Sequence, residues 1–192
     1  MKLTVLGCSG SLPGPDSPAA GYLVESDGYR VVLDLGNGAL GALQRYVAPR
    51  DIDAVVLSHL HADHCLDMTS LMVALRYGPD RPQARIPVIG PNDTEQRITA
   101  AWDADTADLR LRELFDFHLP VSGNLGPFKV EFAPMNHPVP TFAVRMTLGA
   151  GASCTPVTPV NAMRSCGSPR ARTRCSPKRR SVRAIHTCPT CI

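Results

Sequence analysis

The hydrophobic positions divide the first third of the chain into short strands separated by polar turns. Residues 2–7 and 21–24 are mainly apolar, and a further apolar run at 29–34 follows the polar turn at 26–28. A short turn containing Asp-Gly between two such runs predicts a β-hairpin. Residues 54–57, Ala-Val-Val-Leu, are continuously apolar, which is typical of a buried strand. The pattern predicts an antiparallel meander followed by a buried strand.

Further elements are predicted beyond this strand and in the segment before it. Residues 67–77 and 38–46 predict helices. Residues 128–132 alternate apolar and polar side chains, as a half-buried strand does, and residues 141–146 predict the next strand. A chain of 192 residues is a single domain by length. The mixture of helices and strands predicts an α/β fold.

Charge and cysteine usage change sharply toward the C-terminal end. No acidic residue follows Glu131, whereas eight of the 20 basic residues lie from Arg164 onward. The other 12 basic residues stand against all 17 acidic ones, so the first 163 residues carry a net charge of −5. Five of the seven cysteines also lie after residue 153. We therefore divide the chain into a body, residues 1–148, and an aberrant, irregular tail, residues 149–192.

Six residues shortly after the buried strand carry a dense group of potential metal ligands. His59, His61, Asp63 and His64 form the pattern H-x-H-x-D-H. Side chains two residues apart on an extended backbone point the same way, so His59 and His61 can converge on one metal ion. Three imidazoles and a carboxylate are more than one zinc ion needs from a single segment. The spacing favours two metal ions, with a water or hydroxide between them, over a loop of unrelated surface histidines.

This motif resembles the signature of the metallo-β-lactamase fold hydrolases. The resemblance implies an αββα sandwich, incomplete in this chain. It also implies a further histidine ligand in the loop between the last two predicted strands, where His137 stands. One metal would then be held by His59, His61 and His137, and the other by Asp63 and His64.

Two more positions bear on the resemblance. Asp34 lies in a segment similar to the family's D-x-G-x-G, which implies a carboxylate that orients a metal ligand by hydrogen bonding. Its alternative role is to cap the helix predicted at 38–46. Many family members have Gly three residues after the last histidine of the motif, whereas this chain has Asp67. That departure affects the following helix and not a ligand.

The resemblance implies metal-dependent hydrolysis. Two zinc ions, or manganese or iron with the same nitrogen and oxygen ligands, would activate a water molecule. Asp63 and His64 are the catalytic residues in this hypothesis, with Asp63 also able to orient the nucleophile. Ser58 and Cys65 flank the motif but lack a base that is free of the metals, so neither is expected to be the nucleophile.

The substrate class rests on the opening of the chain and on charge. Residues 6–11 and 21–23 are similar to the ribonuclease Z branch and to the related cyclic-nucleotide phosphodiesterases, which both cleave phosphodiesters. The negative body and the acidic segment 102–116 disfavour a large nucleic acid. We therefore expect a small-molecule phosphodiester such as a cyclic nucleotide. The alternatives are ribonuclease Z-like RNA processing, hydrolysis of a thioester, lactone or β-lactam, and an inactive metal-binding remnant.

Three interpretations of the tail compete. A basic arm that binds nucleic acid does not explain the cysteines, and a zinc or disulfide module lacks a second close cysteine pair beside the C-x-x-C at 188–191. A shifted reading frame explains both the basic charge and the cysteines of the tail. With codon boundaries moved by one base, residues 157–160 permit Gly-Asp-Thr-Gly and residues 189–192 permit Asp-Leu-His, both similar to downstream family sequence. His186 then has no selected role, and a chain lacking the later ligands and strands is expected to fold poorly and to turn over substrate weakly.

The sequence gives no sign of a membrane or secretory segment. It has neither an apolar stretch of 18 residues nor a charged, then hydrophobic, leader with a cleavage site. We expect a cytoplasmic protein with no membrane partner.

Overall fold

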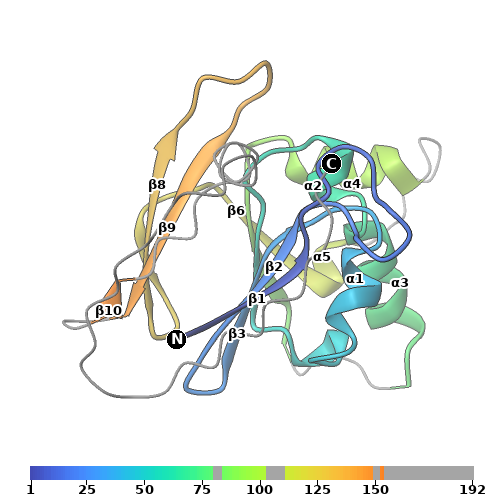
Figure 1. Ribbon diagram of the computed structural model, residues 1–192, viewed down its shortest axis with the longest axis horizontal. Coiled ribbons are helices and arrows are strands. Elements are labelled where there is room, and N and C mark those ends of the chain that lie inside the picture. Colours follow the sequence, from blue (N-terminus) through green and yellow to red (C-terminus); the bar gives the residue numbers. More distant parts are fainter. Residues whose placement is uncertain (80–83, 103–110, 149–151, 154–192) are drawn as a thin grey trace.

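The computed structural model describes residues 1–79, 84–102 and 111–148, and the backbone of residues 152–153. Its strands form two sheets (Figure 1). The strands of the first sheet are, in order across it, β1 (Lys2–Gly7), β2 (Gly21–Ser26), β3 (Tyr29–Leu35), β4 (Ala54–Val56), β5 (Ile86–Ile89) and β6 (Phe115–His118). Those of the second are β10 (Ala152–Ser153), β9 (Phe142–Leu148), β8 (Phe128–Pro134) and β7 (Gly123–Leu125).

The first sheet changes from antiparallel to parallel at β3. β1, β2 and β3 form the predicted antiparallel meander, and β3, β4, β5 and β6 run parallel. Asp27 and Gly28, with φ of 51° and 81°, form the β2–β3 turn. Two central residues with positive φ match the twist of the flanking strands, so the hairpin prediction is confirmed.

Helices fill the connections between the parallel strands and lie on one face of the first sheet (Figure 1). They are α1 (Ala39–Leu43), the 3-10 turn η1 (Pro49–Asp51), α2 (Ala62–Cys65), α3 (Met68–Tyr77), α4 (Thr94–Trp102) and α5 (Leu111–Leu114). α3 agrees with the helix predicted at 67–77. α1 is shorter than predicted, because the N–H groups of Arg45 and Tyr46 bond to carbonyls three residues back and tighten the chain into a turn.

Both faces of the central strands are buried, against different partners. Val32 and Val55 belong to the core between the sheet and the helices. Their neighbours Val31 and Val56 pack instead with Phe128 and other residues of β8 and β9. Side chains alternate between the faces of a strand, so the continuous apolar run in β4 supplies both cores at once.

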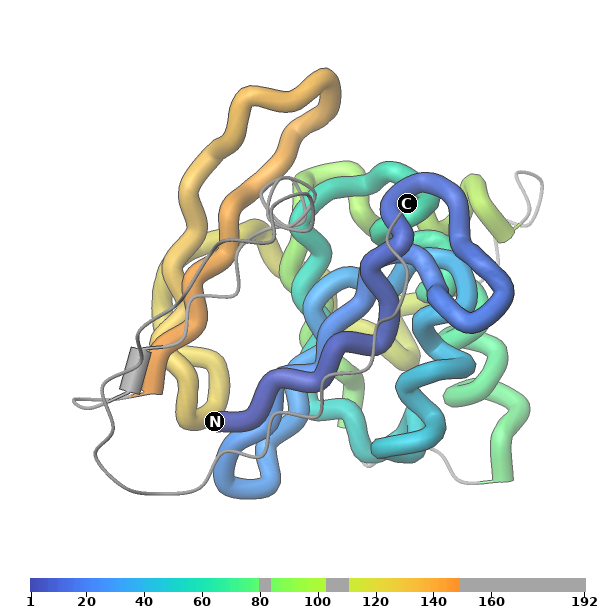
Figure 2. The backbone as a smooth tube through the Cα atoms, in the orientation of Figure 1, coloured from blue at the N-terminus to red at the C-terminus, as the bar shows by residue number. Residues whose placement is uncertain are grey.

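The described residues therefore form three stacked layers: helices, first sheet and second sheet. Figure 2 shows β8 and β9 as a long hairpin on the side of the first sheet opposite the helices. This is the α/β arrangement of the predicted αββα sandwich, and within the described residues the outer face of the second sheet carries no helix. None of the described helices has the length and apolar character needed to cross a lipid bilayer.

The predicted tail, residues 149–192, lies outside the described residues apart from the backbone of 152–153, where β10 pairs with β9. The boundary after residue 148 and the shifted reading frame stay predictions. The DNA sequence across codons 140–192 and beyond tests them directly. An open shifted frame that spells Gly-Asp-Thr-Gly would support them, and a confirmed written frame would contradict them.

Candidate metal centre

The H-x-H-x-D-H motif begins where β4 ends, at the carboxyl edge of the parallel strands. The N–H of Leu57 still donates to the carbonyl of Ile89 on β5 (2.8 Å), so the chain stays extended until the motif starts. His59 is 2% exposed, whereas His61 is half-buried at the start of α2. α2 then carries Asp63 and His64. A buried strand end followed by one helical turn thus holds the whole motif.

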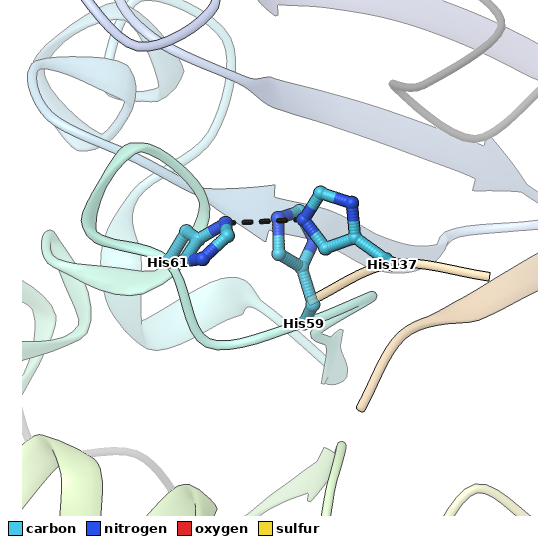
Figure 3. Close-up of side chains that lie close together, drawn as sticks. All are labelled: His59, His61 and His137. Carbon is cyan, nitrogen blue, oxygen red and sulfur yellow. Dashed lines mark hydrogen bonds between the residues drawn. The ribbon is translucent and has the colours of Figure 1, made fainter. Parts of the chain in front are cut away.

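His137 reaches this edge from the loop between β8 and β9 (Figure 3). Two backbone hydrogen bonds hold that loop: Met135 N–H donates to the carbonyl of Thr141 (2.8 Å), and Phe142 N–H to that of Ser58 (3.0 Å). The second bond fastens the start of β9 to the residue before His59. The hairpin is therefore joined to the motif through the backbone.

The structure brings together the three histidines predicted to share one metal. One ring nitrogen from each of His59, His61 and His137 lies within 4.8 Å of the others. Nε2 of His137 and Nδ1 of His61 are 3.2 Å apart (Figure 3). Three convergent imidazoles are a common ligand set for zinc, with room for a further ligand. Their role as ligands stays a prediction, and the geometry fits it.

Asp63 and His64 lie beside this group rather than within it. The ring of His64 is 4.0 Å from that of His59, centroid to centroid, and its Nε2 is 3.3 Å from a carboxylate oxygen of Asp63. The backbone of Asp63 is held from the other side, because the N–H of Ala20 donates to its carbonyl (3.1 Å). Gly36 lies against that same carbonyl, and a Cβ at position 36 would come within 1.8 Å of it. The glycine of the D-x-G segment is required by this contact.

Asp34 is the buried carboxylate that joins these parts. It is 0% exposed and has a φ of 56°, which is uncommon for a residue other than Gly. One oxygen accepts the N–H of Ser58 (2.7 Å), and the other lies 2.8 Å from Oγ of Ser58 and 2.9 Å from Nδ1 of His64. Of its two predicted roles, these contacts match the orientation of a ligand by hydrogen bonding and not the capping of a helix.

Asp67 forms its hydrogen bond to the start of helix α1. The N-cap residue of α1, Gly38, makes no side-chain cap bond, and a carboxylate oxygen of Asp67 accepts the N–H of Leu40 instead (2.9 Å). Burial raises the pKa of Asp67, and the backbone bonds from Leu40 and Gly38 oppose that shift. The sequence showed that position 67 departs from the family pattern. No local pattern predicts its hydrogen bond to Leu40, which lies 27 residues away.

Burial keeps the key histidine in its neutral form. It lowers the pKa of His59 to about 4, and the neighbouring His64 adds to the effect while Asp34 opposes it. A neutral imidazole is the form that binds a metal. Cys65, by contrast, packs in the helix-side core, and burial raises the pKa of its thiol to about 11. Such a thiol is protonated at neutral pH, in agreement with its exclusion as a nucleophile.

Among the described residues, His118 is the one histidine that lies apart from this group. His118 ends β6 and lies exposed, 3.2 Å from Asp116. His186 lies outside the described residues. Sequence reasoning missed Arg97 on α4, whose Nε donates to the carbonyl of Leu60 inside the motif (3.2 Å).

Comparison with known proteins agrees with the geometry. Residues 14–127 match the family model described as the metallo-beta-lactamase superfamily. Similar relatives are protein ML1173 of Mycobacterium leprae (44% identity), the probable metallo-hydrolase YhfI of Bacillus subtilis (33%) and the ribonuclease Z of Thermobifida fusca (29%). The matches cover 80%, 78% and 76% of this chain, and 55%, 60% and 46% of the respective relatives.

The crystal structure of Bacillus subtilis YhfI superimposes with a TM-score of 0.65 at 31% identity, over 77% of this chain and 59% of that one. This chain thus spans about half the length of the relatives that it matches. The match of the family model to more than half of the chain, together with the shared fold, places it plainly: the chain belongs to the metallo-beta-lactamase superfamily.

Proposed function

We propose that this chain carries the metal-binding half of a hydrolase that uses two divalent metal ions, zinc in the first instance, to cleave a small phosphodiester such as a cyclic nucleotide. The observation that carries the proposal is the convergence of His59, His61 and His137 beside the pair Asp63 and His64. Manganese or iron would suit the same nitrogen and oxygen ligands.

The pair Asp63 and His64 offers an independent test of whether a second cation fits. Nδ1 of His64 faces the carboxylate of Asp34, so in the neutral ring the proton belongs on Nδ1. Nε2 is then an acceptor that faces an acceptor oxygen of Asp63 at 3.3 Å. Two acceptors in contact repel each other, and a cation shared between them, a proton or a metal ion, removes the repulsion. The residues present therefore fit a metal at this second position.

The chain's own residues have distinct tasks in this proposal. His59, His61 and His137 hold one ion, Asp63 and His64 hold the other, and Asp34 keeps His64 in the orientation that binds. When bound, divalent ions of this kind lower the pKa of a coordinated water to about 7 and offset negative charge that develops on substrate oxygens. Asp63, half-buried beside the histidines, would orient the attacking water.

Two observations favour a small phosphodiester. One relative is a ribonuclease by name, and ribonucleases act on phosphodiester bonds. The first 163 residues carry a net charge of −5, which opposes the approach of a long polyanion but not of a singly charged small substrate. An RNA substrate of the ribonuclease Z kind is the second candidate, and the same relative favours it.

Turnover of four substrates by the zinc-loaded chain tests the proposal: cyclic AMP, bis-p-nitrophenyl phosphate, a precursor transfer RNA and a β-lactam reporter. We expect weak hydrolysis of the first two, and its loss on chelation and in Asp63→Asn. Faster cleavage of the RNA would replace the small-substrate proposal, and cleavage of the β-lactam alone would refute phosphodiester chemistry. Tight zinc binding without any turnover would indicate the inactive remnant.

A further inference from the structure

Ser58 lies between the buried carboxylate Asp34 and the buried ligand candidate His59. Its Oγ is 2.8 Å from Oδ2 of Asp34 and 3.0 Å from Nδ1 of His59. The three side chains are 0%, 0% and 2% exposed for Asp34, Ser58 and His59 respectively. Water therefore does not compete for these bonds, and each group depends on the others for its partners.

The chemistry of a hydroxyl sets the direction of both bonds. A serine hydroxyl has one proton to donate, and Ser58 donates it to the carboxylate of Asp34. The hydroxyl oxygen then faces Nδ1 of His59 only as an acceptor. That bond requires a proton on Nδ1, which leaves Nε2 as the nitrogen with a free lone pair.

The same carboxylate oxygen also faces Nδ1 of His64, at 2.9 Å. One oxygen atom thus acts on two histidines, on His64 directly and on His59 through the hydroxyl. The backbone N–H of Ser58 donates to the other oxygen of Asp34 at 2.7 Å and holds the carboxylate in place. The two metal positions proposed above are linked through this single side chain.

We propose that Ser58 is a positioning residue that passes the hydrogen bond of Asp34 on to His59 and so fixes His59 as the Nδ1–H tautomer, with Nε2 directed to a metal. This inference rests on the proposed metal centre. It also gives the hydroxyl next to the motif a defined role other than nucleophile, because its proton is committed to a buried carboxylate.

The first measurement is the tautomer of His59 in the metal-free full chain, from long-range proton–nitrogen NMR correlations of labelled histidine. We expect a proton on Nδ1 in the wild type and its redistribution between both nitrogens in Ser58→Ala. A wild-type His59 that carries its proton on Nε2 would overturn the inference, even if the alanine variant failed to fold.

The second measurement is zinc affinity by competition with a chromophoric chelator. Loss of a partner behind a metal ligand typically lowers affinity about 10- to 100-fold, which we expect for Ser58→Ala. Ser58→Thr keeps the hydroxyl and should restore both the tautomer and the affinity. Thr94→Ala is the matched control, because Thr94 is also a buried hydroxyl, bonded to the carbonyl of Pro91.

These readouts separate the inference from the proposed function. If Ser58→Ala keeps the wild-type tautomer and zinc affinity, the role of Ser58 is refuted while the metal centre stands. If the wild type binds no zinc, the proposed function fails, whereas the NMR measurement still decides whether Ser58 fixes the tautomer. An equal loss of affinity in Thr94→Ala would reduce the effect to general destabilisation and refute the inference.

Discussion

The two sides of the candidate site are built in different ways. The strand side consists of Asp34, Ser58, His59 and His64, all buried at the end of the parallel strands and joined by side-chain hydrogen bonds. The hairpin side consists of His137, half-buried in a loop that two backbone hydrogen bonds hold. The strand side should therefore couple metal binding to folding, whereas the hairpin side should affect metal binding with little effect on stability.

The largest effect is expected at the centre of the strand side. Asp34→Ala removes the acceptor for Ser58 N–H, Ser58 Oγ and His64 Nδ1 at once. Removal of one partner from a buried charged network typically costs about 3–5 kcal/mol. Denaturant unfolding of the metal-free chain measures this loss. Asp34→Asn, which keeps the shape and one acceptor oxygen, should lose less, and a near-wild-type stability of the alanine variant would contradict the comparison.

A substitution at Gly36 tests how tightly the backbone around position 36 packs against the motif. Gly36→Ala forces a Cβ to within 1.8 Å of the carbonyl oxygen of Asp63, so the chain must shift, at a cost of about 3 kcal/mol or more. Gly41→Ala is the control, because nothing lies within 4 Å of a Cβ there. In helix α1 that substitution should stabilise the protein by about 0.5–1 kcal/mol. Similar melting temperatures for the two variants would refute this account of Gly36.

A pair of histidine variants compares the two sides directly. Both His59→Ala and His137→Ala should lower zinc affinity by more than about 100-fold. That value is the upper limit for loss of a residue that only hydrogen-bonds to a metal ligand. Their stabilities should differ: about 2–4 kcal/mol lost for buried His59, and about 1 kcal/mol or less for His137. Chelator competition and denaturant unfolding give the two quantities, and equal destabilisation would remove the distinction between the sides.

The pH dependence of the metal-free protein is a further test of the strand side. The pKa of folded His59 is lowered from 6.5 to about 4, so between these values the unfolded chain takes up a proton that the folded chain does not. The free energy of unfolding should therefore fall as pH drops from 6.5 toward 4. His59→Gln should show a shallower fall than the wild type. Identical slopes in the two proteins would contradict the neutral, buried state of His59.

More of the strand side than of the hairpin side could be predicted from the sequence. The motif at 59–64, the hairpin with its Asp-Gly turn and the helix at 67–77 all follow from local spacing and periodicity. Strand β5 and helix α4 were not predicted. β5 has only four residues, one of them Pro, and α4 has few apolar positions. Neither therefore shows a clear periodic pattern of hydrophobic residues.

His137 shows the limit most clearly. Its place near the motif came from a family resemblance, and nothing in its own neighbourhood specifies a partner 76 residues away. The same holds for Asp34 and Asp67, whose contacts with His64 and Leu40 join segments that are far apart in the sequence.

The sequence by itself determined the family and the elements with strong periodicity, and it indicated the candidate metal ligands at 59–64, because these depend on spacing along a few residues. Only the tertiary structure decided which groups hydrogen-bond to Asp34, that Asp67 bonds to the start of α1, and which three histidines converge. Those contacts depend on the meeting of chain segments about 25 to 75 residues apart, which packing of the sheets brings about and which leaves no local pattern.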